Sequence, residues 1–320
     1  MRRALVLFLV LFSAVAARAG NLTVKSPTDN AYLGTSNQLR FLVTGATFDV
    51  TVTAKVTGAA GTSTFSGTFT PNADGQIDNS ISLDFGSSTP QGDYTITATA
   101  TEQGNTYPTR TIPVKIDTVA PKFLEQSPND GQFVKGTVRI RLTLKEPNMK
   151  EWSVRVNGQA IPNNTGTSTL VAVDWDTSLV DNDGSQTISV TATDQAGNSS
   201  SRNISVTLDR TKPITTITYP TGNTRITSGT TVPVLIDITD LNSQSVSATG
   251  VDVILTTESG QYLARVALVT FRSSGGNAVR WTGRIRYRRG DLPSRFKLVV
   301  TTVDRAGNRA VPQEVLLLGM

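Results

Sequence analysis

The sequence has 320 residues, with 30 Lys and Arg, 25 Asp and Glu, and neither His nor Cys. The absence of His and Cys excludes Ser-His-Asp and Cys-His catalysis, zinc sites with nitrogen or sulfur ligands, and disulfide bonds. With 38% hydrophobic and 17% charged residues, the composition is too apolar for a disordered chain and too polar for an integral membrane protein. We therefore expect a soluble, folded protein, whose remaining chemical groups are carboxylates, hydroxyls, amides and the backbone.

Residues 1–19 are predicted to be a cleaved signal peptide. Two arginines precede an apolar run at residues 4–12, and the small residues Ala17 and Ala19 mark a cleavage site. A transmembrane helix is the alternative, but the run is far shorter than the roughly 20 apolar residues that a bilayer requires. Without this segment 27 basic and 25 acidic side chains remain, so net charge gives no reason to expect nucleic acid. We expect the protein to be secreted, periplasmic or at the cell surface.

One sequence element recurs three times in the rest of the chain. Residues 96–105, 188–198 and 298–308 each alternate apolar and polar side chains and end in a Gly-Asn pair. Asp117 and Asp209 are each followed four positions later by a proline, and the interval between them is the length of one small domain. The predicted domains are residues 20–117, 118–209 and 210–320.

Within each unit the hydrophobic period is two, which is typical of a strand with one buried face. Such strands are expected at residues 39–43, 138–145 and 232–238, and a second strand of each unit at 48–52, 152–156 and 251–255. The pair Asn157-Gly158 predicts a two-residue hairpin turn. No segment shows a helical stripe. Short strands with one apolar face bury that face between two sheets, so we predict an all-β fold of sandwich domains.

Together the repeated features resemble tandem bacterial immunoglobulin-like (Big-type) domains of exported surface proteins. The resemblance is carried by the Asp-x-Ala-Gly-Asn turns at 194–198 and 304–308 and by the Asp-x-x-x-Pro linkers that begin at Asp117 and Asp209. The first unit departs from the pattern, because its turn is shorter and begins with Glu102. The resemblance implies three tandem immunoglobulin-like β-sandwiches. Gly92-Asp93-Tyr94 is also similar to the tyrosine corner of such sandwiches.

The resemblance also places six carboxylates. In immunoglobulin sandwiches the loops after the second and sixth strands lie at the end where the preceding linker enters. Oxygen ligands from three segments would then meet there, and calcium is the candidate cofactor that would stiffen the linker of an exported chain without disulfides. The alternative is that each turn Asp accepts a hydrogen bond from its own backbone in an Asx-turn. The expected clusters are Asp117, Glu146 and Asp194, and Asp209, Asp240 and Asp304.

The last unit has the strongest local charge pattern, at residues 280–289. Arginines alternate there with apolar side chains, so a strand would carry the arginines on one face. That face could bind an acidic polysaccharide or a partner's carboxylates through forked hydrogen bonds. The alternative is a solvated face whose charge discourages edge-to-edge aggregation. The candidate ligand-binding residues are Arg280, Arg284, Arg286 and Arg288.

Two functions remain open. The first is an exported, non-catalytic structural or adhesive rod that interacts with a cell-envelope protein or polysaccharide. The second is a carbohydrate-binding accessory protein for acidic polysaccharide, linked to glycan hydrolysis, which uses the arginine face and exposed aromatics such as Trp175. The acidic segment 174–184 fails the spacing of an EF-hand and is expected to form a turn. Each unit has only enough residues for one sandwich, which favours the first function.

Overall fold

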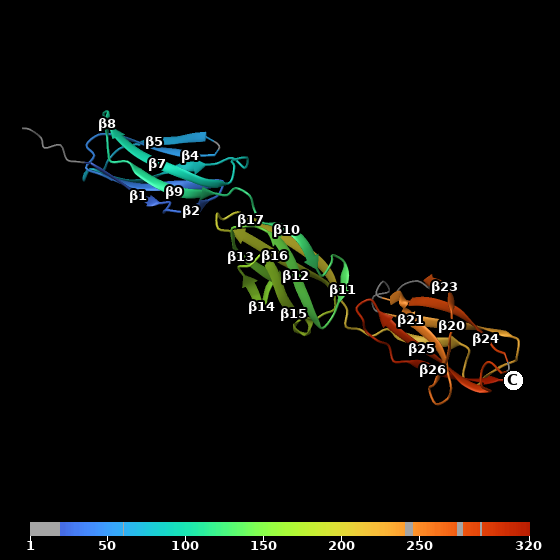
Figure 1. The fold of residues 1–320 in the computed structure, drawn as a ribbon. Coiled ribbons are helices and arrows are strands. Elements are labelled where there is room, and N and C mark those ends of the chain that lie inside the picture. Colours follow the sequence, from blue (N-terminus) through green and yellow to red (C-terminus); the bar gives the residue numbers. More distant parts are fainter. Residues whose placement is uncertain (1–19, 60, 241–245, 274–277, 289) are drawn as a thin grey trace, which may run out of the picture. The chain divides into compact units, whose positions relative to one another are not determined.

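The structure, a computed structural model, describes residues 20–59, 61–240, 246–273, 278–288 and 290–320. The predicted signal peptide at residues 1–19 lies outside this part of the chain. The described residues form β-strands and one short 3-10 helix, without any α-helix. The strands make six sheets, which pack in pairs as three immunoglobulin-like β-sandwiches (Figure 1). The predicted all-β fold is confirmed.

The first sandwich contains strands β1 to β9. Their bounds are β1 (Asn21–Ser26), β2 (Ala31–Leu33), β3 (Ser36–Thr44), β4 (Val50–Gly58), β5 (Gly61–Phe69), β6 (Gln76–Asp84), β7 (Gly92–Glu102), β8 (Asn105–Thr106) and β9 (Arg110–Ile116). One sheet has the order β1-β3-β6, and the other has the order β2-β9-β7-β4-β5, with β8 paired to β7. Alternate side chains of facing strands, such as Phe41, Val52 and Ile96, form its core.

The second sandwich contains strands β10 to β17. Their bounds are β10 (Lys122–Ser127), β11 (Gln132–Val134), β12 (Thr137–Lys145), β13 (Met149–Val156), β14 (Gln159–Gly166), β15 (Leu170–Asp176), β16 (Gly184–Asp194) and β17 (Ser199–Leu208), with the 3-10 helix η1 (Thr177–Leu179) after β15. The sheet β10-β12-β15 faces the sheet β11-β17-β16-β13-β14. Trp175 is 2% exposed. The expectation that it is an exposed aromatic is wrong, because it shares the inward face of β15 with Val171 and Val173.

The third sandwich contains strands β18 to β26. Their bounds are β18 (Ile214–Tyr219), β19 (Thr224–Ile226), β20 (Thr231–Thr239), β21 (Val246–Thr256), β22 (Tyr262–Arg265), β23 (Leu268–Ser273), β24 (Ala278–Arg286), β25 (Arg295–Asp304) and β26 (Gln313–Gly319). The sheet β18-β20-β24-β23 faces the sheet β19-β26-β25-β21-β22. Its core includes Ile236, Trp281 and Phe296. The sandwich therefore buries the predicted positions Val234, Ile236 and Ile238 of β20, while Val232 is half-buried.

A short parallel pairing recurs in each sandwich. The pairs are β2 with β9, β11 with β17, and β19 with β26. In the first two sandwiches the next residue continues the pairing, because the N–H groups of Asp117 and Asp209 donate to the carbonyls of Leu33 and Val134 at 2.9 and 3.0 Å. Each linker thus begins with an aspartate whose backbone N–H is hydrogen-bonded at an equivalent position of its sandwich.

Two turn predictions agree with the structure. Asn157 and Gly158 have φ angles of 50° and 78° and join β13 to β14. Tyr94 is buried, and its hydroxyl donates to the Pro90 carbonyl at 2.9 Å, as a tyrosine corner requires. The strand expected from residue 48 begins at Val50 instead, and Phe48 is 53% exposed.

The chain divides into two compact units. The first contains the chain up to Pro121 together with two short segments, 146–150 and 193–200, and the second contains the remaining residues. The two short segments follow β12 and the end of β16, so loops of the second sandwich group with the first unit. These loops carry predicted carboxylate ligands. The predicted domain boundaries stay a prediction.

Candidate functional site

Three acidic side chains meet in the first compact unit. Asp117 directly follows β9, Glu146 directly follows β12, and Asp194 is the last residue of β16. One carboxylate oxygen of each residue lies within 4.8 Å of the others. All three residues are buried, with exposed fractions of 2%, 6% and 0%. The structure therefore brings together this predicted set from three separate segments.

A second set with the same arrangement lies in the second compact unit. Asp209 directly follows β17, Asp240 directly follows β20, and Asp304 is the last residue of β25. Their nearest carboxylate oxygens also lie within 4.8 Å of one another, and all three residues are buried. Each member of this set occupies the place of its counterpart in the first. A buried arrangement that recurs in this way belongs to the repeat rather than to one loop.

An asparagine joins the linker to the turn in each set. The Asn198 Nδ2 donates to the Asp117 carbonyl at 2.7 Å and to the Asp194 Oδ2 at 2.8 Å. The Asn308 Nδ2 donates to the Asp209 carbonyl and to the Asp304 Oδ2, both at 2.8 Å. Sequence reasoning recognised these asparagines only as turn residues. The recurring Gly-Asn pair was the signal that could have identified this bridging role.

The turns also contain the hydrogen bonds from backbone N–H groups to the turn aspartate that an Asx-turn would make. The Asp194 Oδ1 accepts from the Asn198 N–H at 2.9 Å, and the Asp304 Oδ1 accepts from the Asn308 N–H at 2.7 Å. Gly197 has a φ angle of 87°, a conformation that side chains disfavour. Hydrogen bonding within the turn and clustering of the carboxylates therefore occur together in the same residues.

The first set concentrates negative charge in a buried place. Burial raises the pKa of Glu146, and the charges of Asp117 and Asp194 raise it further, while a hydrogen bond from the Asn148 N–H at 2.7 Å opposes the rise. Within the described part of the chain, no Lys or Arg forms an ion pair with these three carboxylates. A divalent cation with a preference for oxygen ligands would offset this repulsion.

The first sandwich has a different arrangement at the end of β7. The Glu102 Oε1 accepts from the N–H groups of Thr47 and Phe48 at 2.6 and 2.5 Å, and its Oε2 accepts from the Tyr107 hydroxyl at 2.5 Å. Burial alone would raise the pKa of Glu102, but these hydrogen bonds lower it below its ordinary value. Burial, this hydrogen bond and the charge of Glu102 raise the pKa of Tyr107 to about 12. Hydrogen-bond donors thus satisfy this carboxylate, and no further acidic residue joins it in the described part of this sandwich.

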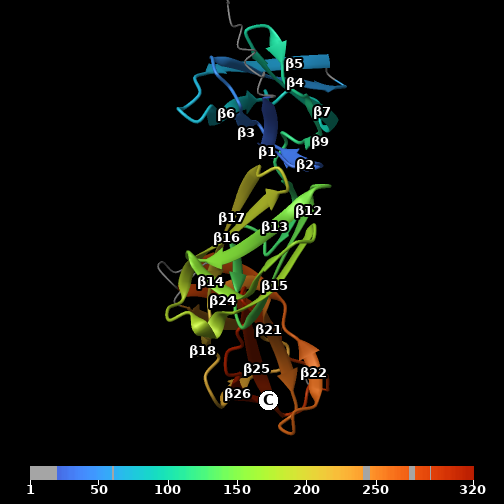
Figure 2. The ribbon, with the colours of Figure 1, turned by 90° about the vertical axis from the view of Figure 1, so that its left-hand side faces the viewer.

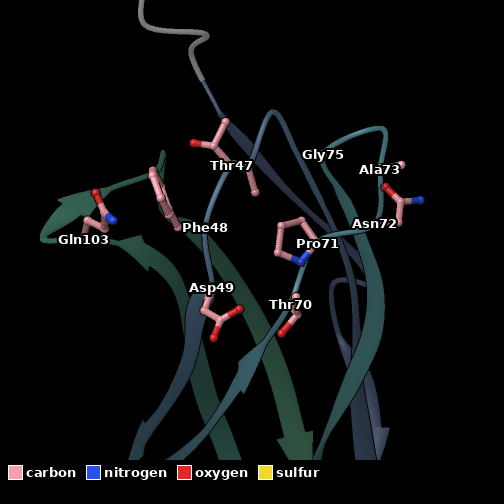
Figure 3. A pocket seen from close by; sticks show the side chains of 10 residues that line it. Thr47, Phe48, Asp49, Thr70, Pro71, Asn72, Ala73, Gly75 and Gln103 are labelled. Carbon is pink, nitrogen blue, oxygen red and sulfur yellow. The ribbon is translucent and has the colours of Figure 1, made fainter.

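The loop that Glu102 holds lines an open depression of about 690 Å³. Figure 3 shows Phe48, Pro71, Asn72 and Gln103 around it. A backbone bond from the Ala46 N–H to the Gly75 carbonyl at 3.0 Å links the two loops that form its walls. Where the second and third sandwiches place an acidic side chain after β12 and β20, the first has this hydrogen-bonded loop instead.

The four predicted arginines lie on the exposed face of β24 and the residues after it. Arg280 donates from Nε and Nη2 to the two carboxylate oxygens of Asp237, each at 2.6 Å. Arg284, Arg286 and Arg288 form no ion pair with any described residue. β23 pairs with β24 only as far as Gly283, so Arg280 lies inside the sheet, whereas Arg284 and Arg286 lie where β20 is the one described neighbour of β24. Three of the four cations are therefore available to a ligand.

The acidic segment 174–184 spans the end of β15, the connection at residues 177–183 and the first residue of β16. The Asp176 Oδ1 accepts from the Ser178 N–H at 2.9 Å and caps η1. Asp183 accepts from the Arg210 Nε at 2.7 Å and from the Arg210 N–H at 2.8 Å. The predicted turn is therefore found at residues 177–183, whereas Asp174, Trp175 and Asp176 belong to β15.

No model of a known protein family matches the chain, and no curated protein matches its sequence. Among solved structures, the chain is similar to a mutated variant of the three titin immunoglobulin domains I67–I69, with 11% identity, a TM-score of 0.40, and coverage of 94% of this chain and 98% of that one. It is also similar to a four-repeat segment from the extending region of a large adhesion protein, with 23% identity, a TM-score of 0.29, and coverage of 93% and 74%.

A third similar structure is a Ca²⁺-stabilized adhesin that helps an Antarctic bacterium to bind ice, with 20% identity, a TM-score of 0.32, and coverage of 95% of this chain and 75% of that one. These identities, coverages and TM-scores describe how similar the structures are. The assignment of the fold rests on the order of the strands in the six sheets. Within the described residues, no helix is long and apolar enough to cross a membrane.

Proposed function

We propose that this chain is a non-catalytic, exported spacer or adhesive module of tandem immunoglobulin-like sandwiches whose linkers are fixed by calcium. The observation that supports it most directly is the recurrence of a buried three-carboxylate set, once around Asp117 and once around Asp209. Repeated sandwiches without a catalytic histidine or cysteine suit a structural or adhesive task at the cell envelope or outside the cell.

Calcium suits the ligand atoms at both sets. Calcium prefers carboxylate and carbonyl oxygens, and the residues that would hold it are Asp117, Glu146 and Asp194 in one unit and Asp209, Asp240 and Asp304 in the other. Binding requires ionised carboxylates, whereas the metal-free cluster raises the pKa of Glu146. A bound Ca²⁺ would therefore offset the repulsion among the three carboxylates by its attraction to each of them.

The mechanical consequence concerns the linkers. Asp117 and Asp209 begin the linker segments, while the other ligands of each set lie at the ends of strands. An ion shared among them would hold each linker to two strand ends, in addition to the Asn198 and Asn308 bridges and the hydrogen bond from the Asn148 Nδ2 to the Asp117 Oδ2. Calcium would then restrict bending at the linkers and strengthen the chain against pulling.

Thermal unfolding with calcium and with a chelator tests this function. We expect calcium to raise the transition temperature of the full chain, and Glu146→Gln combined with Asp240→Asn to abolish the increase. The exposed Asp93→Asn variant is the matched control and should keep the full increase, because Asp93 pairs with Lys115 and belongs to neither set. An unchanged transition temperature in chelator would refute the calcium clamp.

The arginine face supports binding of acidic polysaccharide as a second candidate function. Its supporting observation is that Arg284, Arg286 and Arg288 are exposed and without ion-pair partners among the described residues. We expect Arg284→Ser with Arg286→Ser to weaken binding to an acidic glycan and to reduce its salt dependence. Lys115→Ser, in the first sandwich, is the control. Equal and salt-insensitive binding by the arginine variant would remove this candidate.

A further inference from the structure

Strand β5 is an exposed sheet edge without the usual protection. It pairs with β4 along all nine of its residues and lies at the outside of its sheet. Figure 2 shows β5 next to β4, and the sheet order ends at β5. No other backbone group in the described part of the chain pairs with it. In an antiparallel pair every second residue directs its N–H and carbonyl away from the partner strand, so these groups form an open template.

The other sheet edges carry features that oppose pairing with a further strand. Four edge strands have only two or three residues: β2, β8, β11 and β19. Six are paired to their neighbour through a register shift: β1, β10, β14, β18, β22 and β23. The last two, β6 and β15, each contain two aspartates. Short length, bulges and charge are the means by which proteins block edge pairing.

Strand β5 has none of these features. Its sequence, Gly-Thr-Ser-Thr-Phe-Ser-Gly-Thr-Phe, contains no charged residue and no proline. Its register with β4 runs without a shift from one end to the other. The contrast is therefore between one long, regular, uncharged edge and a set of edges that are each short, irregular in register or charged.

Aromatic anchors hold β5 in a defined position. The Phe69 ring meets the Phe41 ring edge-on, with 5.2 Å between centroids, and the Phe65 ring meets the Phe85 ring at 5.9 Å. Both anchors pack against the core of the first sandwich. The strand therefore offers its free edge in a fixed conformation, which reduces the entropy that a pairing strand must lose.

We infer that β5 pairs antiparallel with β5 of a second copy of this chain, which joins two first sandwiches into one continuous sheet. A two-fold pairing places each edge residue opposite a residue of the same strand, so a charged edge would face its own charge. β5 consists only of threonine, serine, glycine and phenylalanine, so it brings no charged side chain to that contact. Its alternate residues Thr62, Thr64, Ser66 and Thr68 are exposed and would lie opposite the equivalent row of the second copy.

Sedimentation of the full chain over a range of concentrations tests this inference. We expect the wild type to form a dimer, and Ser66→Glu to raise the dissociation constant by about tenfold or more, because two carboxylates would approach each other across the pair. Thr165→Glu is the matched control. It places the same charge on the exposed edge strand β14 of the second sandwich and should leave the dimer unchanged. A wild type that stays monomeric, or equal effects of both variants, would overturn the inference.

Single cysteines provide a second, geometric measurement. The native sequence has no cysteine, so single substitutions to Cys at positions 62, 64, 66 and 68 report only the new thiol. Oxidation should give one maximum of disulfide-linked dimer, because only the position nearest the two-fold axis faces its own copy. Uniform or absent cross-linking would contradict the pairing, even if the chain dimerises in another way.

Discussion

Glu146 and Glu102 show how the immediate neighbours of a carboxylate decide its response to pH. Glu146 faces two other carboxylates, and its pKa is raised by burial and by their charges. Glu102 faces two backbone N–H groups and a tyrosine hydroxyl, and these hydrogen bonds lower its pKa despite burial. The first environment is suited to a cation, and the second is already complete without one.

The raised pKa of Glu146 predicts a pH dependence of the metal-free protein. The folded state holds the Glu146 proton more tightly than the unfolded chain does, so its contribution to stability is present below the ordinary value of 4.5 and is lost as pH rises through the raised pKa. In chelator, Glu146→Gln should remove this loss and unfold at the same temperature as the wild type, or higher, at neutral pH. In calcium the same variant should unfold at a lower temperature than the wild type.

Melting curves between pH 4 and pH 8, with chelator and with calcium, measure both effects. The change of sign between the two conditions is the distinctive result, because a purely structural role for Glu146 would lower the transition temperature in both. Equal destabilisation with and without calcium would contradict the cation interpretation.

At the scale of elements, the turns after β16 and β25 connect secondary structure to the linkers. Each turn is closed by its own Asp and Asn, and the same Asn holds the carbonyl of the linker Asp. The turn after β7 begins with Glu102 instead, and the corresponding Asn105 is exposed. The end of β7 therefore resembles the ends of β16 and β25 in sequence, but it makes different hydrogen bonds.

This difference predicts unequal effects of the same substitution. Asn308→Ala should lower the free energy of unfolding by about 1–3 kcal/mol, because it removes the side-chain N–H that donates to the buried Asp304 Oδ2 and to the Asp209 carbonyl. Asn105→Ala is the matched control in the first sandwich and should have a much smaller effect. Denaturant unfolding followed by intrinsic fluorescence measures both, and equal losses would contradict the bridging role.

At the scale of the whole molecule, the two carboxylate sets lie in different compact units. Loops that belong to the second sandwich by sequence group with the first unit, and one of the sets includes residues of those loops. Because each set contains a linker aspartate, the proposed calcium effect belongs to the connections between successive repeats. The inferred pairing of β5 lies on the first sandwich, remote in sequence from both sets, so the two experiments can fail independently.

The sequence by itself determined the features that depend on local periodicity. The period-two pattern predicted the inward faces of strands such as β12 and β20, and the recurring turn predicted three sandwiches of one kind. The tyrosine corner and the Asn157-Gly158 hairpin were also recognisable, because each depends on residues that are close together in the sequence. The six carboxylates were placed through a resemblance to known domains, and the structure supplies their separations.

Only the tertiary structure decided which residues far apart in sequence became neighbours. Trp175, flanked by two aspartates, turned inward because the pairing of β15 with β12 set its face. Arg280 pairs with Asp237 on the adjacent strand β20, and the other three arginines do not share this carboxylate. The bridges of Asn198 and Asn308 and the open edge of β5 likewise depend on strand order. Local sequence encodes which side of a strand is apolar, whereas partners are chosen by how the sheets assemble.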